Sequence, residues 1–313
     1  YHYISENKTW SEAQSYCREK YTDLATVYDM TDMKRLLDST ENQGEAWIGL
    51  YNQTDSNRTW HWSLPGVEYN ESEAKWLEGQ PNDHEGKLEN CNMWLILIFC
   101  VSCSNYCREH HTDLVSGVHQ LEDEEFKKAI GSNNQVWIGL FRDTWRWSDG
   151  SSFSFRHWDH DSFDKQQNEK KCALTKLDEK GRWKCESCNE TKPFFCYDDK
   201  VILINQSKTW VEALYYCREN HYDLVSITNL NEQRWVQERA KKANTPYVWL
   251  GLRYTCALDF WFWVSDEAVG YKNWVSDGVM DDCDMSEAMD TGGQHKWFRK
   301  PDNETFNFIC SKF

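Results

Sequence analysis

The sequence predicts an α+β protein built from three tandem domains that disulfide bonds hold together. A first motif occurs three times, as SYCREKYTDLATV, NYCREHHTDLVSG and YYCRENHYDLVSI, at residues 15–27, 105–117 and 215–227. A second signature follows each copy, as AWIGL, VWIGL and VWLGL, at residues 46–50, 136–140 and 248–252. Two signatures that recur in the same order indicate a repeated domain. The third observation is the content of 13 cysteines in 313 residues, which suits three small domains with one disulfide framework.

Each repeat should contain two helices, small antiparallel sheets and a long loop. We place the domains at residues 1–100, 101–198 and 199–313. In the outer repeats the first helix should begin at a capping box, Thr9 with Glu12 and Thr209 with Glu212, because the two side chains satisfy each other's free backbone N–H groups. Aromatic and turn residues after the W-I/L-G-L signature predict short strands and long loops. A second helix is expected around residues 31–38, 122–130 and 231–243.

Composition and charge favour an extracellular protein and exclude several function classes. Three copies of one cysteine framework are typical of extracellular disulfide scaffolds. The formal net charge of −16 argues against a surface that binds nucleic acid or anionic membranes. The apolar run at 93–101 is too short to cross a membrane, so we expect any membrane anchor, and the export signal, to lie outside this sequence. Seven N-x-S/T sequons support export, at Asn7, Asn52, Asn57, Asn70, Asn189, Asn205 and Asn303.

The sequence contains none of the common catalytic motifs. The ten histidines form no H-E-x-x-H pattern, and there is no G-x-S-x-G, Walker or G-x-G-x-x-G sequence. Two C-x-x-C spacings, at 100–103 and 185–188, overlap the disulfide framework, so we attribute them to chance rather than to zinc or redox chemistry. We therefore predict a binding protein and not an enzyme. The tryptophans at equivalent positions of the W-I/L-G-L signature, Trp47, Trp137 and Trp249, are expected in the core.

The order of these features resembles that of C-type lectin-like domains. The features are the two helices, the W-I/L-G-L signature, a loop, and closing strands that end in PFFCY at 193–197 or FNFICS at 306–311. The resemblance covers nearly the whole chain, and the tandem arrangement is similar to that of fish lectins and the mannose-receptor group. It implies that the cysteine of the first helix bonds to the cysteine of the last strand, and that a second bridge closes the base of the long loop.

The resemblance implies three disulfide pairs, Cys107 with Cys196, Cys217 with Cys310, and Cys172 with Cys188. In the third domain Cys283 lacks the family's downstream partner. Since Cys256 is the remaining cysteine there, we expect these two to pair, which requires a Cα separation of roughly 4.4 to 6.8 Å.

The junction between the first two repeats departs from the family's pattern. The distance from the loop-base cysteine to the next helix cysteine is 45 residues after Cys172 but 16 after Cys91. The missing stretch would hold the end of the first domain and the opening strand and capping box of the second. We hypothesise that ILIFC at 96–100 serves as a substitute last strand and that Cys17 pairs with Cys100. A skipped exon or a gene-model error is the alternative explanation of this junction.

The resemblance implies a calcium-dependent sugar site in the first domain. In the family a Glu-Pro-Asn or Gln-Pro-Asp triplet, an acid before the next cysteine and a later Trp-Asn-Asp hold the ion, which takes six to eight oxygen ligands. The first domain has Gln80-Pro81-Asn82, and Glu89 precedes Asn90-Cys91, so Gln80, Asn82 and Glu89 are the implied ligands of calcium and sugar. The triplet mixes the mannose-type and galactose-type forms. The Trp-Asn-Asp segment falls in the missing stretch, and a polar surface turn is the alternative reading.

The second and third domains have lost most of this signature. Ser162-Phe163 replaces the first two triplet residues, Lys170 replaces the acid, and Trp183-Lys184-Cys185 replaces Trp-Asn-Asp. A site rebuilt from three aspartates of the second domain is the alternative, and the acids of the third domain are expected in a solvated loop. These residues are Asp159, Asp161 and Asp164, and Asp277, Asp281, Asp282 and Asp284.

The predicted function is extracellular carbohydrate binding that depends on Ca²⁺ through the first domain, with glycans or glycoproteins as partners. The alternative is calcium-independent recognition of a protein ligand by domains that have lost the sugar site.

Overall fold

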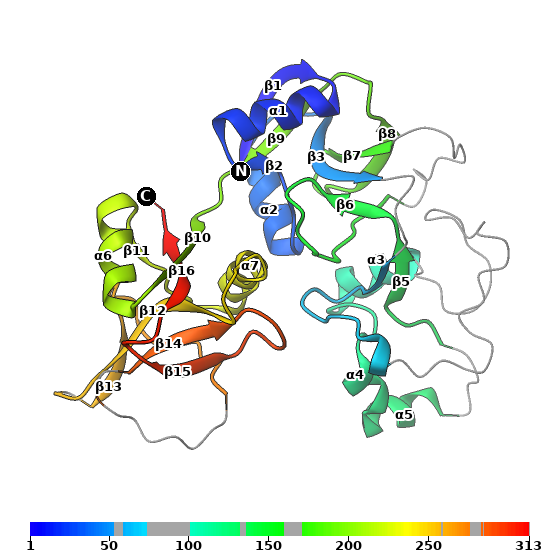
Figure 1. Cartoon of the computed structure of the whole chain (residues 1–313). Coiled ribbons are helices and arrows are strands. Elements are labelled where there is room, and N and C mark those ends of the chain that lie inside the picture. The colour runs from blue at the N-terminus through cyan, green and yellow to red at the C-terminus, as the bar shows by residue number, and fades with distance from the viewer. Residues whose placement is uncertain are drawn as a thin grey trace. The chain divides into compact units, whose positions relative to one another are not determined.

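The computed structural model describes residues 1–52, 59–73, 101–131, 136–159, 171–257, 259–275, 283 and 285–312, and the structural statements below concern these residues. The chain forms two compact units, Tyr1–Asp198 and Asp199–Phe313 (Figure 1). The division falls where the sequence predicts the start of the third domain. No compact unit begins at the boundary predicted after residue 100, because strands from both sides of it share one sheet.

The second unit, which we call the C-terminal domain, is a complete α+β domain made from one continuous stretch of chain. Its sheet has the order β10-β16-β12-β14-β15, with β11 beside β16 and β13 beside β12. The two helices are α6 (Trp210–Asn220) and α7 (Leu230–Ala240). The strands are β10 (Val201–Lys208), β11 (Asp223–Leu224), β12 (Tyr247–Thr255), β13 (Phe260–Trp263), β14 (Met285–Asp290), β15 (Trp297–Pro301) and β16 (Phe306–Ser311).

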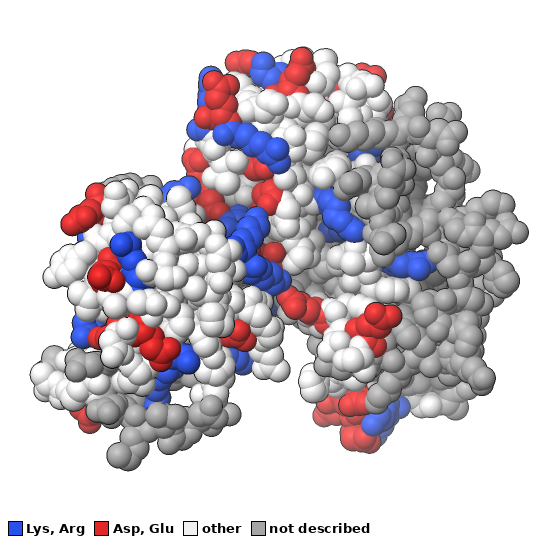
Figure 2. All heavy atoms as spheres, viewed as in Figure 1, with Lys and Arg blue, Asp and Glu red and all other residues white. Residues whose placement is uncertain are grey.

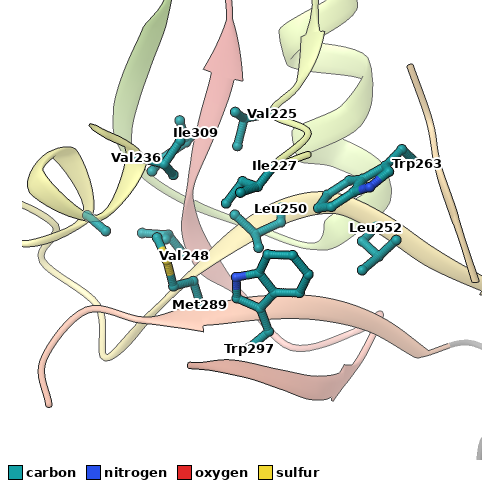
Figure 3. Packing of buried hydrophobic residues seen from close by; sticks show 11 residues of the cluster. Val225, Ile227, Val236, Val248, Leu250, Leu252, Trp263, Met289, Trp297 and Ile309 are labelled. Atoms are coloured by element: carbon teal, nitrogen blue, oxygen red, sulfur yellow. The ribbon is translucent and has the colours of Figure 1, made fainter. Parts of the chain in front are cut away.

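The core of the C-terminal domain lies on both faces of β12. On one face, aliphatic side chains pack around Trp263 and Trp297 (Figure 3). On the other, Trp249 packs with Phe308 and the Cys217–Cys310 disulfide under α6. The signature glycine Gly251 is required because a Cβ there would approach the Leu224 carbonyl oxygen to 2.8 Å.

The first unit contains a second complete domain, assembled from two separate stretches of chain. Its sheet order, β1-β9-β3-β7-β8 with β2 beside β9 and β6 beside β3, is the same as in the C-terminal domain. We call it the composite domain, because residues 1–52 come from the first repeat and residues 145–198 from the second. Its elements are β1 (His2–Lys8), α1 (Trp10–Lys20), β2 (Asp23–Leu24), α2 (Met30–Asp38), β3 (Glu45–Asn52), β6 (Trp145–Trp147), β7 (Lys171–Lys176), β8 (Trp183–Ser187) and β9 (Lys192–Tyr197).

The chain between these two stretches, which we call the inserted segment (residues 53–144), holds the remaining halves of the first two repeats. Its described strands, β4 and β5, pair with each other. Its described elements are β4 (Thr59–Trp62), the 3₁₀ turn η1 (Glu71–Glu73), α3 (Val101–His110), α4 (Val118–Glu122), α5 (Glu124–Ile130) and β5 (Leu140–Asp143).

The two repeats exchange strands reciprocally. In the C-terminal domain Leu252 pairs with Trp263 of the same repeat. In the first unit Leu50 of the first repeat pairs with Trp147 of the second. In return, Leu140 of the second repeat pairs with Trp62 of the first. The physical reason is that the opening strand β1 and the closing strand β9 belong to different repeats and pair with each other in one sheet.

The exchange corrects two disulfide predictions. Cys196 bonds to Cys17, with a Cα separation of 5.3 Å, so both the Cys107–Cys196 pair and the Cys17–Cys100 pair are wrong. The cause is that β9 lies against β1 and β2, with Leu24 opposite Cys196, which places Cys196 under α1. Cys107 of α3 is a free, half-buried thiol.

The other three disulfide predictions are confirmed, Cys172–Cys188, Cys217–Cys310 and Cys256–Cys283, the last with a Cα separation of 5.5 Å. Both predicted capping boxes are also formed, at the starts of α1 and α6.

Candidate functional site

The long loop of each complete domain starts and ends at the same places in the fold. In the composite domain Trp158 forms a bridge with Trp183, and the loop returns to the sheet at Lys171. In the C-terminal domain Trp274 bridges Trp297 in the same way. Trp183 and Trp297 are each fully buried at the start of β8 and β15. The ends of the two loops therefore lie at the same edge of equivalent sheets, and this is the loop in which the family resemblance places the calcium and sugar site, although the sequence predicts that the site is lost in both of these domains.

The predicted calcium and sugar ligands Gln80, Asn82 and Glu89 lie outside the described residues. The same is true of Lys170 and of all the candidate loop acids except Asp159. Asp159 is ion-paired with Lys176 on β7, and this hydrogen bond raises the pKa of Lys176. In the described part of the chain, no group of three His, Cys, Asp or Glu side chains is arranged to hold a metal ion.

In the composite domain a lysine stands where the family has the asparagine of Trp-Asn-Asp. Lys184 follows the buried Trp183, and its Nζ lies 2.7 Å from Glu45 Oε1. Burial alone would raise the pKa of Glu45, but hydrogen bonds from Lys184 and Lys192 lower it. A lysine ammonium is only a donor, whereas calcium takes oxygen ligands, so this position does not fit the ion.

In the C-terminal domain an arginine stands where the family has the aspartate. Arg299 Nε lies 3.9 Å from Glu287 Oε1 on the neighbouring strand. Its guanidinium also lies over the rings of Trp261 and Trp274, 5.6 and 6.0 Å from their centroids. These contacts place a cation beside two neighbouring tryptophans at the edge of the long loop, an arrangement that suits cation–π contact and excludes calcium ligation by this residue.

The disulfide at the base of the long loop in the composite domain has no counterpart at the equivalent positions of the C-terminal domain, whose loop is bonded instead through Cys283 to Cys256. Cys172 and Cys188 bond in the composite domain. The equivalent positions in the C-terminal domain are Ser286 and Asp302, five residues after Trp297 as Cys188 is after Trp183. Asp302 instead forms an ion pair with Arg253, at 2.7 Å. The sequence analysis did not identify this pair, although the shared Asn-Glu-Thr after Cys188 and Asp302 reveals the equivalence.

Charged side chains of both signs are scattered over the described residues in the view of Figure 2, without one large patch of a single sign. The described helices include none that is both long and apolar enough to cross a membrane.

Comparisons with known proteins agree with this architecture. The family described as the lectin C-type domain matches residues 6–95, 100–198 and 206–312. Human C-type mannose receptor 2 is 26% identical over 201 residues, covering 55% of this chain and 14% of the receptor. The secretory phospholipase A2 receptor of Pongo abelii is 24% identical over 360 residues, covering 85% of this chain and 24% of the receptor. This chain thus spans less than a quarter of the length of these relatives.

Among solved structures, human lithostathine is 26% identical with a TM-score of 0.34, covering 36% of this chain and 81% of that chain. Because the family matches in three successive segments that together take in most of the sequence, the chain belongs to the C-type lectin domain family.

Proposed function

We propose that this protein binds carbohydrate outside the cell, through a calcium site in the first repeat held by Gln80, Asn82 and Glu89. Calcium, when bound, would accept sugar hydroxyls into its coordination shell. Carboxylate and amide oxygens are ligands that calcium prefers. The family membership and the similarity to a protein named C-type mannose receptor 2 support a glycan or glycoprotein as the partner.

One observation directs this proposal to the first repeat. In the two complete domains the positions of the family's Asn-Asp carry Lys184 and Arg299, and both cations have described partners, Glu45 and Glu287. The first repeat keeps the proline-centred triplet and the acid before the cysteine. The four described disulfides support an extracellular location, because such bonds persist in oxidising compartments.

Retention on immobilised mannose and galactose, with and without EDTA, tests the proposal. We expect retention on at least one sugar, its loss in EDTA, and its loss in the Asn82→Ala variant. Asp161→Ala is the matched control, since it changes an acid in the second repeat and should leave retention unchanged. Retention that survives both EDTA and Asn82→Ala would refute the calcium site, and loss in the control would favour a site rebuilt in the second repeat.

A second candidate function is calcium-independent recognition of a protein ligand by the two complete domains. The contact of Arg299 with both Trp261 and Trp274 favours it, because tryptophan and arginine are enriched among the residues that contribute most to protein interfaces. Nearby, Phe260 at the start of β13 is 47% exposed. A glycan array on which the protein binds nothing, together with protein binding that EDTA leaves intact and Trp261→Ala weakens, would establish this function instead.

A further inference from the structure

Two sequons occupy the same turn in the two complete domains. Asn189-Glu190-Thr191 connects β8 to β9, and Asn303-Glu304-Thr305 connects β15 to β16. The sequences around them differ, since a bonded cysteine precedes the first and an aspartate the second. The same acceptor sequence therefore stands at one structural position in two domains whose loop bases are built differently.

The two turns have the same hydrogen bonds. The Glu190 N–H donates to the Ser187 carbonyl at 3.0 Å, and the Glu304 N–H donates to the Pro301 carbonyl at 3.0 Å. Each turn therefore closes with the asparagine as its second central residue. Asn189 and Asn303 are both exposed, as are the hydroxyl residues of the two sequons, Thr191 and Thr305. A sugar chain attached at either asparagine projects into solvent without displacing a strand.

We propose that Asn189 and Asn303 carry N-linked glycans. The donor class is a lipid-linked oligosaccharide pyrophosphate. In the transfer a bond forms between the sugar C1 and the side-chain Nδ2, the C1–O bond to the pyrophosphate breaks, and the amide proton leaves as the pyrophosphate is released. The inference rests on the extracellular location that the proposed function requires, because sequons are modified during export.

The position of these glycans determines what they cover. The Cys188 carbonyl accepts a hydrogen bond from the first N–H of α1, Trp10 N, at 3.1 Å, and the Asp302 carbonyl accepts one from Trp210 N of α6 at 3.2 Å. Each glycan thus stands beside the start of the first helix and next to Cys188 or the equivalent Asp302. It keeps other proteins away from that end of the domain.

A third sequon provides a contrast within the same structure. Asn52 lies at the end of the strand β3, where it is half-buried and pairs with Trp145 of β6. Its Oδ1 accepts a hydrogen bond from the Thr144 hydroxyl at 2.6 Å, and Thr144 is itself buried. A glycan on the amide of Asn52 would stand in the exchanged strand pair, so Asn52 should be unmodified in the folded protein.

Peptide mapping of the full chain, secreted by eukaryotic cells into the medium, tests the inference. Peptide-N-glycosidase in heavy-oxygen water converts glycosylated asparagine to labelled aspartate, and we expect the label at Asn189 and Asn303 but not at Asn52. Asn189→Gln and Asn303→Gln should each remove one glycan from the intact mass, whereas Asn52→Gln should remove none.

Secreted protein with unlabelled Asn189 and Asn303 would overturn the inference. That result would leave the proposed function in place, because sugar retention and its sensitivity to EDTA are measured independently. Label at Asn52 would contradict the contrast between turn and strand on which the inference is built.

Discussion

The tryptophan of the W-I/L-G-L signature is buried in the two complete domains and exposed in the inserted segment. Trp47 and Trp249 are fully buried, and their indole N–H groups donate to the carbonyls of Lys8 and Lys208 on the opening strands. Trp137, at the same position of the second repeat, is 46% exposed, and the prediction that it lies in the core is wrong. The signature thus marks where a strand can form, but the opening and closing strands are what bury its tryptophan.

The helix motif behaves differently, because its contacts are local. In all three repeats the arginine after the cysteine forms an ion pair with the aspartate five residues later. The three aspartates are Asp23, Asp113 and Asp223. The N–H of the signature glycine also donates to a carbonyl just beyond that aspartate in each repeat, as Gly139 N does to the Val115 oxygen. The second repeat therefore keeps these local contacts, although its signature tryptophan Trp137 is exposed.

Replacing the signature tryptophan should give the largest difference in stability between a complete domain and the inserted segment. Trp249→Ala should destabilise the C-terminal domain by about 3–5 kcal/mol, since it empties a buried site and leaves the Lys208 carbonyl without its indole donor. Trp137→Ala should change stability by no more than about 0.5 kcal/mol. Hydrogen exchange of the β12 and β5 peptides in the full chain measures both, and equal losses of protection would contradict the contrast.

Removing the cysteine of the first helix should give the second largest difference in stability between a complete domain and the inserted segment. Joint Cys217→Ala and Cys310→Ala replacement removes a bridge with a sequence separation of 93 and should cost about 4.6 kcal/mol in the chain-entropy description. Cys107→Ala, at the equivalent position of α3, removes a free thiol and should leave urea resistance almost unchanged. Pulse proteolysis in urea reports each unit separately. A large loss in Cys107→Ala would mean that this thiol has a partner after all.

Sequence predicted the parts of the fold that are determined over short distances. The capping boxes and the second helices follow from residues close in the chain, and the family resemblance supplied the Cys172–Cys188 and Cys217–Cys310 pairs. Strand exchange could not be predicted, because Trp62 and Trp147 present the same chemistry to Leu50 and Leu140 and neither pairing is favoured by local sequence. The need to join β1 to β9 decides between them, and that requirement involves the whole unit.

The candidate site was predictable to a similar extent. The loss of the calcium signature in the second and third repeats follows from comparing them with the Trp-Asn-Asp motif of the family. The roles of the lysine and the arginine at these positions do not follow, because Glu45, Glu287 and Trp261 reach them from other strands. The Arg253–Asp302 pair does not follow from the sequence, because Arg253 reaches Asp302 from a different strand, β12.

Acid should distinguish the two complete domains. Burial lowers the pKa of His157, which precedes the loop bridge in the composite domain, to about 3. Since its unfolded pKa is near 6.5, only the unfolded chain gains this proton as pH falls, so stability is full above about pH 6.5 and declines below it by up to about 1.4 kcal/mol per pH unit. Asn273 is the equivalent residue before Trp274, and it does not titrate.

His157→Asn places the residue of the C-terminal domain in the composite domain. The variant should show a flatter stability profile between pH 6.5 and 5 than the wild type, as measured by urea midpoints of the first unit. An unchanged slope would show that other groups are responsible for the acid sensitivity of this unit.

The smallest effect should come from the caps that the two complete domains share. Thr9 and Thr209 accept from the N–H groups of Glu12 and Glu212, and in return each glutamate accepts from the threonine N–H at 2.9 and 3.0 Å. Thr9→Ala and Thr209→Ala should each cost about 1 kcal/mol of stability, and the two costs should be similar because the two capping boxes have the same geometry.

The contribution of the caps should also depend on pH. Hydrogen bonds from the threonines lower the pKa of both glutamates, so this contribution is present above their unfolded pKa and is lost as pH falls through the folded value. Exchange rates of the first-turn amides of α1 and α6, measured at neutral pH and near pH 3, test both points, and a cost confined to one helix would show that the caps depend on the rest of their domains.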